Sequence, residues 1–318
     1  MSKQLSLADA MLDPRLGSNA KLEEIGRAID WSRLEGIVRG IRPGESGRPP
    51  YAPLAMLKAL YLQRLYDLSD PGLEEALLDR LSFRRFCGFG LDARTPDETT
   101  ICRFRAAVAA AGVMEKAFAE IVRQFEAQGL LLKKGTLMDA TLVKARHNPP
   151  SAEAGLGAQH PAEPDADWTF RQGRSAFGYK AHIGVDQGSG LVRRVVVTSA
   201  KVYESEVADA LIAGDERAVY GDRAYPQKAR RDRLTALGIK DRLMRRANKH
   251  HPVLPRWRRR WNALVARRRA PVEAVFSAMK RLYGLGRARC TTLARNAADI
   301  FAFAAIYNLR RATLRRNA

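Results

Sequence analysis

The chain has 318 residues, of which 46% are hydrophobic, which is enough for one large domain or two of ordinary size. It contains no run of 18 apolar residues that would predict a membrane span, and its acid-containing N-terminus MSKQLSLADAMLDP lacks the apolar stretch of a signal peptide. Three widely spaced cysteines without a CxxC pair argue against a zinc site or a disulfide scaffold. We therefore expect a reducing, cytoplasmic environment and no membrane partner.

The charge is concentrated in the last third of the chain. Lys and Arg number 55 against 34 Asp and Glu, yet residues 223–318 alone carry 26 basic residues and 4 acids. Such a segment predicts a polyanionic partner, most commonly nucleic acid, although a merely solvated basic face is the simpler alternative. An anionic membrane is disfavoured because Pro252, Pro255 and Pro271 interrupt the basic stretches.

Residues 1–130 are predicted to form a helical N-terminal region. Apolar residues between positions 53 and 68 follow helical spacing. Ser69 or Asp70 can cap the next helix, which has Pro71 in its first turn. The run from Thr95 to Glu98 predicts a capping box that starts another helix.

Residues 131–318 are predicted to form a separate α/β domain. GTLMDATLV is apolar on both faces, which suits a central strand, and FGYKAHIGVD and LVRRVVVTSA flank a hairpin turn at residues 187–190. RAVYGDRAY and IKDRLMRR are expected to add a fourth and a fifth strand, whereas residues 146–175 show no periodicity and are predicted to be a loop. Helices are expected over residues 204–214, 228–238, 268–284 and 296–315. This order predicts a ribonuclease H-like mixed five-stranded sheet with helices on both faces.

Three acids stand out by their context. Asp139 lies inside the apolar strand, where an ionised carboxylate is costly unless a cation neutralises it. Asp222 ends the fourth strand, and Glu273 lies on an amphipathic helix among arginines. A strand, its neighbour and a covering helix could bring these carboxylates together. They could then bind two magnesium-type ions, which assist phosphodiester cleavage. For Glu273 alone, a salt bridge to Arg269 four residues earlier is the simpler interpretation.

These motifs together resemble the DDE insertion-sequence transposases of the IS-five group. The resemblance rests on Arg269, Glu273 and Lys280 spaced R-x3-E-x6-K, on LMDAT around Asp139 and on YGDRAY around Asp222. The segments PLAMLKALYLQRLYDLSDPGLEEALLDRLSFRRFCG, TPDETTICRFR and SAFGYKAHIGVDQGSGLVRRVVVTSAKVYES extend it over roughly residues 5–315. One departure is Ala266, which stands where related transposases have a tyrosine.

The resemblance implies a ribonuclease H-like catalytic domain in which Asp139, Asp222 and Glu273 bind two Mg²⁺ or Mn²⁺ ions. It implies nicking of DNA at terminal inverted repeats, followed by attack of the 3′-hydroxyl on target DNA. The N-terminal helices would bind the DNA ends or mediate dimerisation, and at least a homodimer is expected on DNA. Only about 50 residues separate Asp222 from Glu273, so we expect no inserted domain between them.

Further residues are predicted to contact DNA. Arg269, Lys280 and Arg281 would bind the phosphate backbone, and Lys180 and His182 on the polar face of the second strand could reach phosphate, unless they are simply exposed strand residues. Trp257 and Trp261, between arginines, could stack on unpaired bases or form the core face of a helix. A nuclease without strand transfer and a transposase-derived repressor are the alternative functions.

Overall fold

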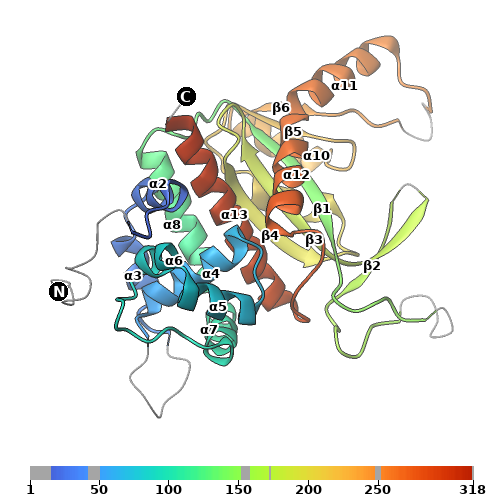
Figure 1. Cartoon of the computed structure of the whole chain (residues 1–318). Coiled ribbons are helices and arrows are strands. Elements are labelled where there is room, and N and C mark those ends of the chain that lie inside the picture. Colours follow the sequence, from blue (N-terminus) through green and yellow to red (C-terminus); the bar gives the residue numbers. More distant parts are fainter. Residues whose placement is uncertain (1–15, 42–50, 152–157, 172, 248–251, 317–318) are drawn as a thin grey trace. The chain divides into compact units, whose positions relative to one another are not determined.

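The computed structural model describes residues 16–41, 51–151, 158–171, 173–247 and 252–316 (Figure 1). The N-terminal segment in which we expect no signal peptide lies outside the described residues. Within them, no helix combines the length and apolar character that a membrane crossing requires. The chain separates into two compact units, one made of residues up to 125 and from 301 onward, the other of residues 126–300.

The first unit is helical, as the sequence predicts. Helix α4 (Pro53–Leu65) is buried on almost all sides, which makes it the centre of this unit. The Trp31 ring meets Tyr61 of α4 and Phe86 edge-on, with ring centroids 6.0 and 5.7 Å away. The other helices of this unit are α2 (Ala20–Ala28), α3 (Ser32–Val38), α5 (Asp70–Asp79), α6 (Leu81–Cys87), α7 (Glu98–Ala110), α8 (Val113–Ala127) and the end of α13 (Leu293–Arg316).

Two helix starts test the capping predictions. The Ser69 hydroxyl accepts a hydrogen bond from the Gly72 amide at 3.1 Å, so the predicted cap of α5 is confirmed. The predicted cap of α7 at Thr95 is wrong, because Asp97 has the extended backbone of an N-cap and its carboxylate accepts from the Thr100 amide at 2.6 Å. This hydrogen bond lowers the pKa of Asp97, and a carboxylate there also complements the helix dipole.

The second unit is built on a mixed sheet with one strand more than the five predicted. Its strands are β1 (Thr136–Lys144), β2 (Asp167–Arg171), β3 (Arg174–Asp186), β4 (Val192–Ser199), β5 (Ala218–Gly221) and β6 (Lys240–Leu243). The additional strand is β2, which pairs with the first five residues of β3 (Figure 1). Sequence periodicity missed it because β2 is short and is stabilised by its pairing with β3, not by an apolar stripe of its own.

Four strands of this sheet, β1, β4, β5 and β6, run in the same direction. β1 runs parallel to β5, and β5 parallel to β6. β3 is antiparallel to both β1 and β4, so β4 runs in the same direction as β1. The carboxyl ends of β1, β4 and β5 therefore lie at the same edge of the sheet.

The helices of this unit differ in part from the prediction. The segment after β4 forms a short α9 (Glu204–Val207) and a 3-10 turn (Ala208–Leu211) in place of one longer helix. Helix α10 (Lys228–Ala236) agrees with its predicted range. The helix expected from residue 268 begins at Pro271, where α12 (Pro271–Tyr283) follows α11 (Arg256–Arg269) (Figure 1). Proline lacks the amide that would continue the hydrogen-bonding pattern of α11.

Candidate metal centre

Asp139 lies in the middle of β1 between buried neighbours and is only 7% exposed. Burial raises the pKa of its carboxyl group, the guanidinium of Arg269 opposes this shift, and the nearby Asp222 adds to it. A buried, ionised Asp139 is thus costly unless positive charge is supplied.

Asp222 is placed beside Asp139 by the strand register. Thr136 and Leu137 of β1 pair with Val219 and Tyr220 of β5, so the same register, continued by two residues, brings Asp139 level with Asp222. One carboxylate oxygen of Asp222 accepts a hydrogen bond from the Ala224 amide at 2.8 Å, which fixes the side chain at the strand end. Two acids predicted to act together are therefore neighbours.

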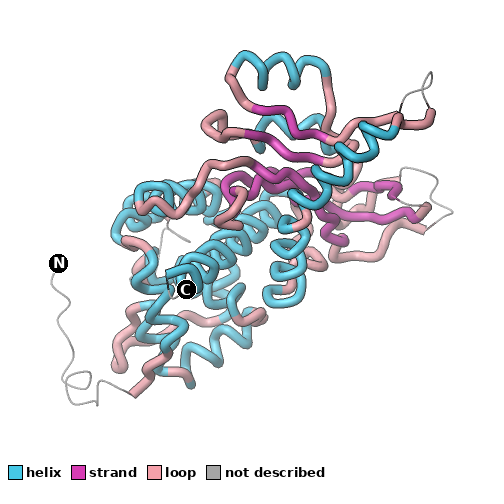
Figure 2. Tube along the Cα trace, turned by 90° about the horizontal axis from the view of Figure 1, so that it is seen from above, coloured by secondary structure: helices cyan, strands magenta, loops and turns pink. Residues whose placement is uncertain are grey.

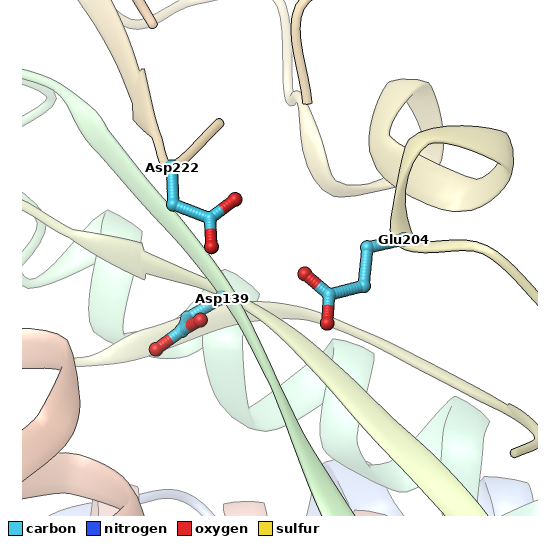
Figure 3. Close-up of side chains that lie close together, drawn as sticks. All are labelled: Asp139, Glu204 and Asp222. Atoms are coloured by element: carbon cyan, nitrogen blue, oxygen red, sulfur yellow. The ribbon is translucent and has the colours of Figure 1, made fainter. Parts of the chain in front are cut away.

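Glu204, the first residue of α9, supplies a third carboxylate that sequence reasoning missed. One oxygen from each of Asp139, Glu204 and Asp222 lies within 4.8 Å of the others (Figure 3). A sequence signal existed, since Glu204 starts the helix that follows the third predicted strand. Using it required knowing that β4 runs parallel to β1, which the sequence alone does not specify.

Tyr225 lies among these carboxylates in the core. Its side chain is fully buried, and its hydroxyl has no hydrogen-bond partner in the described part of the chain. Burial, followed by the negative charges of Glu204, Asp139 and Asp222, raises its pKa well above the ordinary value. A Cβ at Gly221 would come within 2.9 Å of the Tyr225 ring, so the residue before Asp222 must be small for this packing.

The core beneath the carboxylates is continuous and apolar. It includes Met138 beside Asp139, Tyr225 just after Asp222, and residues of the 3-10 turn that follows α9. The complete cluster comprises Met138, Ala208, Leu211, Ile212, Val219, Tyr225, Leu234, Ile239 and Leu243. The three carboxylates are therefore held by well-packed backbone.

Arg269 links the carboxylates to Glu273. Its guanidinium lies 2.8 Å from an Asp139 oxygen and 3.5 Å from a Glu273 oxygen. The salt bridge between Arg269 and Glu273 that the spacing predicts is thus present. The Glu273 side chain is 68% exposed, and it is not one of the three converging acids.

The other residues predicted to contact DNA lie in different environments. Lys280 and Arg281 are exposed on α12, whereas Lys180 donates to the Val202 carbonyl at 2.8 Å, just before Glu204. The expectation that His182 lies on an exposed face is wrong, because this side chain is fully buried and bonds the Thr198 hydroxyl at 3.0 Å. The 3-10 turn after α9 packs against that face of β3 and β4, and burial lowers the pKa of His182 to about 4.

Comparison with known proteins finds two transposase family models that match this chain. A family model described as "Transposase DDE domain" matches residues 131–309, which is more than half of the chain and includes all four acids. A second, "Transposase domain (DUF772)", matches residues 10–107. A cryo-EM structure of the piggyBac transposase synaptic complex with hairpin DNA aligns with 95% of this chain and 73% of its own chain, at 11% sequence identity and a TM-score of 0.43.

Proposed function

The chain belongs to the transposase DDE-domain family, and we propose that it binds the terminal inverted repeats of an insertion sequence, nicks these ends and joins their 3′-hydroxyls to target DNA. The observation that carries this proposal is the convergence of Asp139, Asp222 and Glu204 at one edge of the sheet. Such a site beside a strongly basic segment suits phosphoryl transfer on DNA.

The residues at this edge fit divalent ions of the magnesium type. All three converging ligands are carboxylates, which Mg²⁺ and Mn²⁺ prefer over nitrogen or sulfur. Because burial raises the pKa of Asp139, its ionised carboxylate would be stabilised by a cation bound next to it. Two such ions, when bound, would activate a water or hydroxyl nucleophile and stabilise charge on the leaving oxygen.

The protein's own part is to position charge. Asp139 and Asp222 are fixed on adjacent strands, and Lys180 restrains the loop before Glu204 through the Val202 carbonyl. We retain Glu273 as the third catalytic carboxylate implied by the family resemblance and add Glu204 as a fourth ligand. The Arg269 guanidinium, already near both Asp139 and Glu273, is suited to hold a phosphate beside the carboxylates.

Other parts of the molecule have roles in the same proposal. Lys280 and Arg281 on α12 would bind the DNA backbone, while the buried His182 is assigned to sheet packing. The strand order β4-β3-β1-β5-β6 supports a ribonuclease H-like catalytic domain within the predicted range 131–318, and the sequence motifs are the basis for assigning it to the IS-five group. The helices of residues 1–130 would recognise DNA ends or mediate a homodimer or higher oligomer, acting in the cytoplasm.

The test is a strand-transfer assay with the element's own ends, a supercoiled target plasmid, and Mg²⁺ or Mn²⁺. We expect nicks that expose 3′-hydroxyls and products in which these ends are joined to the plasmid. Nicking without joining would indicate a nuclease, and tight binding without nicking in either ion would indicate a repressor. Asp139→Ala is the matched control, because it removes one carboxylate and should retain binding.

A further inference from the structure

Helix α11 has one anchored face. The Trp261 indole donates a hydrogen bond to the Leu243 carbonyl at 3.1 Å. The Asn262 side chain both accepts from and donates to the backbone of Arg245, at 2.7 and 2.9 Å. Together with the buried Val265, these contacts fix α11 to the segment that follows β6.

The other face of α11 is exposed and strongly basic. Trp257 is 61% exposed and Leu264 is 59% exposed, and together with Arg260 and Arg267 they recur at helical spacing on one side. The helix contains seven arginines and no acid. Of the two tryptophans, Trp261 is thus a packing residue, whereas Trp257 faces solvent with the Arg258 guanidinium 5.1 Å from its ring centroid.

The axis of α11 gives a distance from the carboxylates. Its last residue, Arg269, contacts Asp139, and Trp257 lies twelve residues earlier. At 1.5 Å per residue this corresponds to about 18 Å along the helix. Because each nucleotide of a duplex strand advances about 3.4 Å, the distance equals roughly five nucleotides. Figure 1 and Figure 2 both show α11 extending away from the sheet.

We propose that DNA leading away from the scissile phosphate lies along the exposed face of α11, and that Trp257 stacks on an unpaired base roughly five nucleotides from the cleavage position. Arg260, Arg267 and Arg268 bind the phosphates between these two points. The arginine-rich composition favours DNA over an uncharged partner, and an exposed indole beside guanidinium groups is suited to base stacking. This inference rests on the proposed function, since it assumes that the scissile phosphate sits at the carboxylates.

The first experiment measures binding without chemistry. Full-length protein carrying Asp139→Asn is titrated, in EDTA, with a 40-base-pair duplex and with the same duplex containing a central ten-nucleotide bubble. We expect a preference for the bubble that Trp257→Ala reduces about tenfold and Trp257→Phe retains. Leu237→Ala, outside α11, is the matched control, because it removes a comparably exposed apolar side chain without a ring and should leave the preference intact.

The charge of the face is tested by the salt dependence of the same binding. Replacing Arg260, Arg267 and Arg268 together by alanine should reduce the slope of log affinity against log salt by roughly two to three. An unchanged slope, or equal affinity of the Trp257→Ala protein and its parent for bubble DNA, would overturn the inference. The inference would also be overturned if these substitutions weakened binding to anionic vesicles more than binding to DNA.

A fluorescent base tests the position at which Trp257 stacks. In each of a series of DNA ends, 2-aminopurine replaces one base, at successive distances from the cleavage point. Trp257 should change the fluorescence most at roughly the fifth nucleotide, and Trp257→Ala should abolish that maximum. If nicking occurs but no such maximum is seen, this inference alone fails. If nicking is absent in every ion but the bubble preference still depends on Trp257, the DNA-binding face stands and the proposed reaction fails.

Discussion

The carboxyl edge of the sheet and helix α11 lie in the same unit but are built differently. At the edge, strands place Asp139 and Asp222 and the short α9 places Glu204, so packed backbone sets the separation of the acids. On α11, only one face is anchored, and the arginines of the other face extend into solvent on flexible side chains. Chemistry needs accurate geometry, whereas phosphate binding needs charge and tolerates movement. Substitutions in the two regions should therefore affect different observables.

The largest effect should follow from Asp222→Asn. Removing one carboxylate from the edge should lower the nicking rate by at least about 10³-fold, because metal-assisted charge stabilisation contributes several kcal/mol. DNA affinity should not fall, since the Asp222 carboxylate is not one of the cations that attract the phosphate backbone. Gel-based nicking and fluorescence anisotropy measure the two quantities. Near-normal nicking by this variant would show that the edge is not the reaction centre.

His182 should give the next largest effect, on stability. Its folded pKa of about 4 lies below the ordinary histidine value, so the unfolded chain takes up the proton first as the pH falls. Its contribution to stability is present above pH 6.5 and is lost between there and pH 4, on the order of 3 kcal/mol. His182→Gln should lose less stability over this range in urea unfolding. If the free energy of unfolding changed with pH in parallel for the wild type and His182→Gln, the burial of a neutral His182 imidazole would be contradicted.

Glu204 and Glu273 should separate metal binding from catalysis. Without DNA, Glu204→Gln should weaken Mn²⁺ binding by at least roughly tenfold. Loss of a residue that only hydrogen-bonds a metal ligand already lowers metal affinity by about tenfold or more, and loss of the ligand itself should lower it at least as much. Glu273→Gln should weaken that affinity less than Glu204→Gln does, because Glu273 is largely exposed and lies outside the three converging acids, yet it should slow nicking. Mn²⁺ titration followed by electron paramagnetic resonance measures the affinity. The opposite pattern would make Glu273 the resident ligand and Glu204 a structural acid.

The smallest effects should come from single cations on α12. Lys280→Ala or Arg281→Ala should each weaken DNA binding a few-fold and reduce the salt slope by roughly one, the value for one phosphate contact. The nicking rate at saturating DNA should stay close to normal, because neither residue lies in the carboxylate cluster. A selective loss of rate at saturation would instead place the cation at the reacting phosphate.

How much the sequence predicts depends on how local each signal is. Asp139 could be recognised because an acid inside a strand that is apolar on both faces is conspicuous, and Asp222 because it ends the fourth predicted strand. Glu204 could not, because its approach to Asp139 depends on the directions of strands far apart in the sequence. The sequence mispredicts the exposure of His182 for a related reason: alternation along β3 does not reveal that the 3-10 turn after α9 packs against that face.

The proposed reaction depends above all on a divalent ion that binds at the carboxyl edge of the sheet. The most direct test of this binding substitutes Fe²⁺ for Mg²⁺, adds ascorbate and peroxide, and maps the resulting backbone cuts by mass spectrometry. We predict cuts beside Asp139, Glu204 and Asp222 that Mg²⁺ suppresses by competition and that Asp139→Asn removes. Cuts confined to other segments, or cuts at this edge that neither Mg²⁺ nor Asp139→Asn affects, would contradict the binding of a divalent ion there.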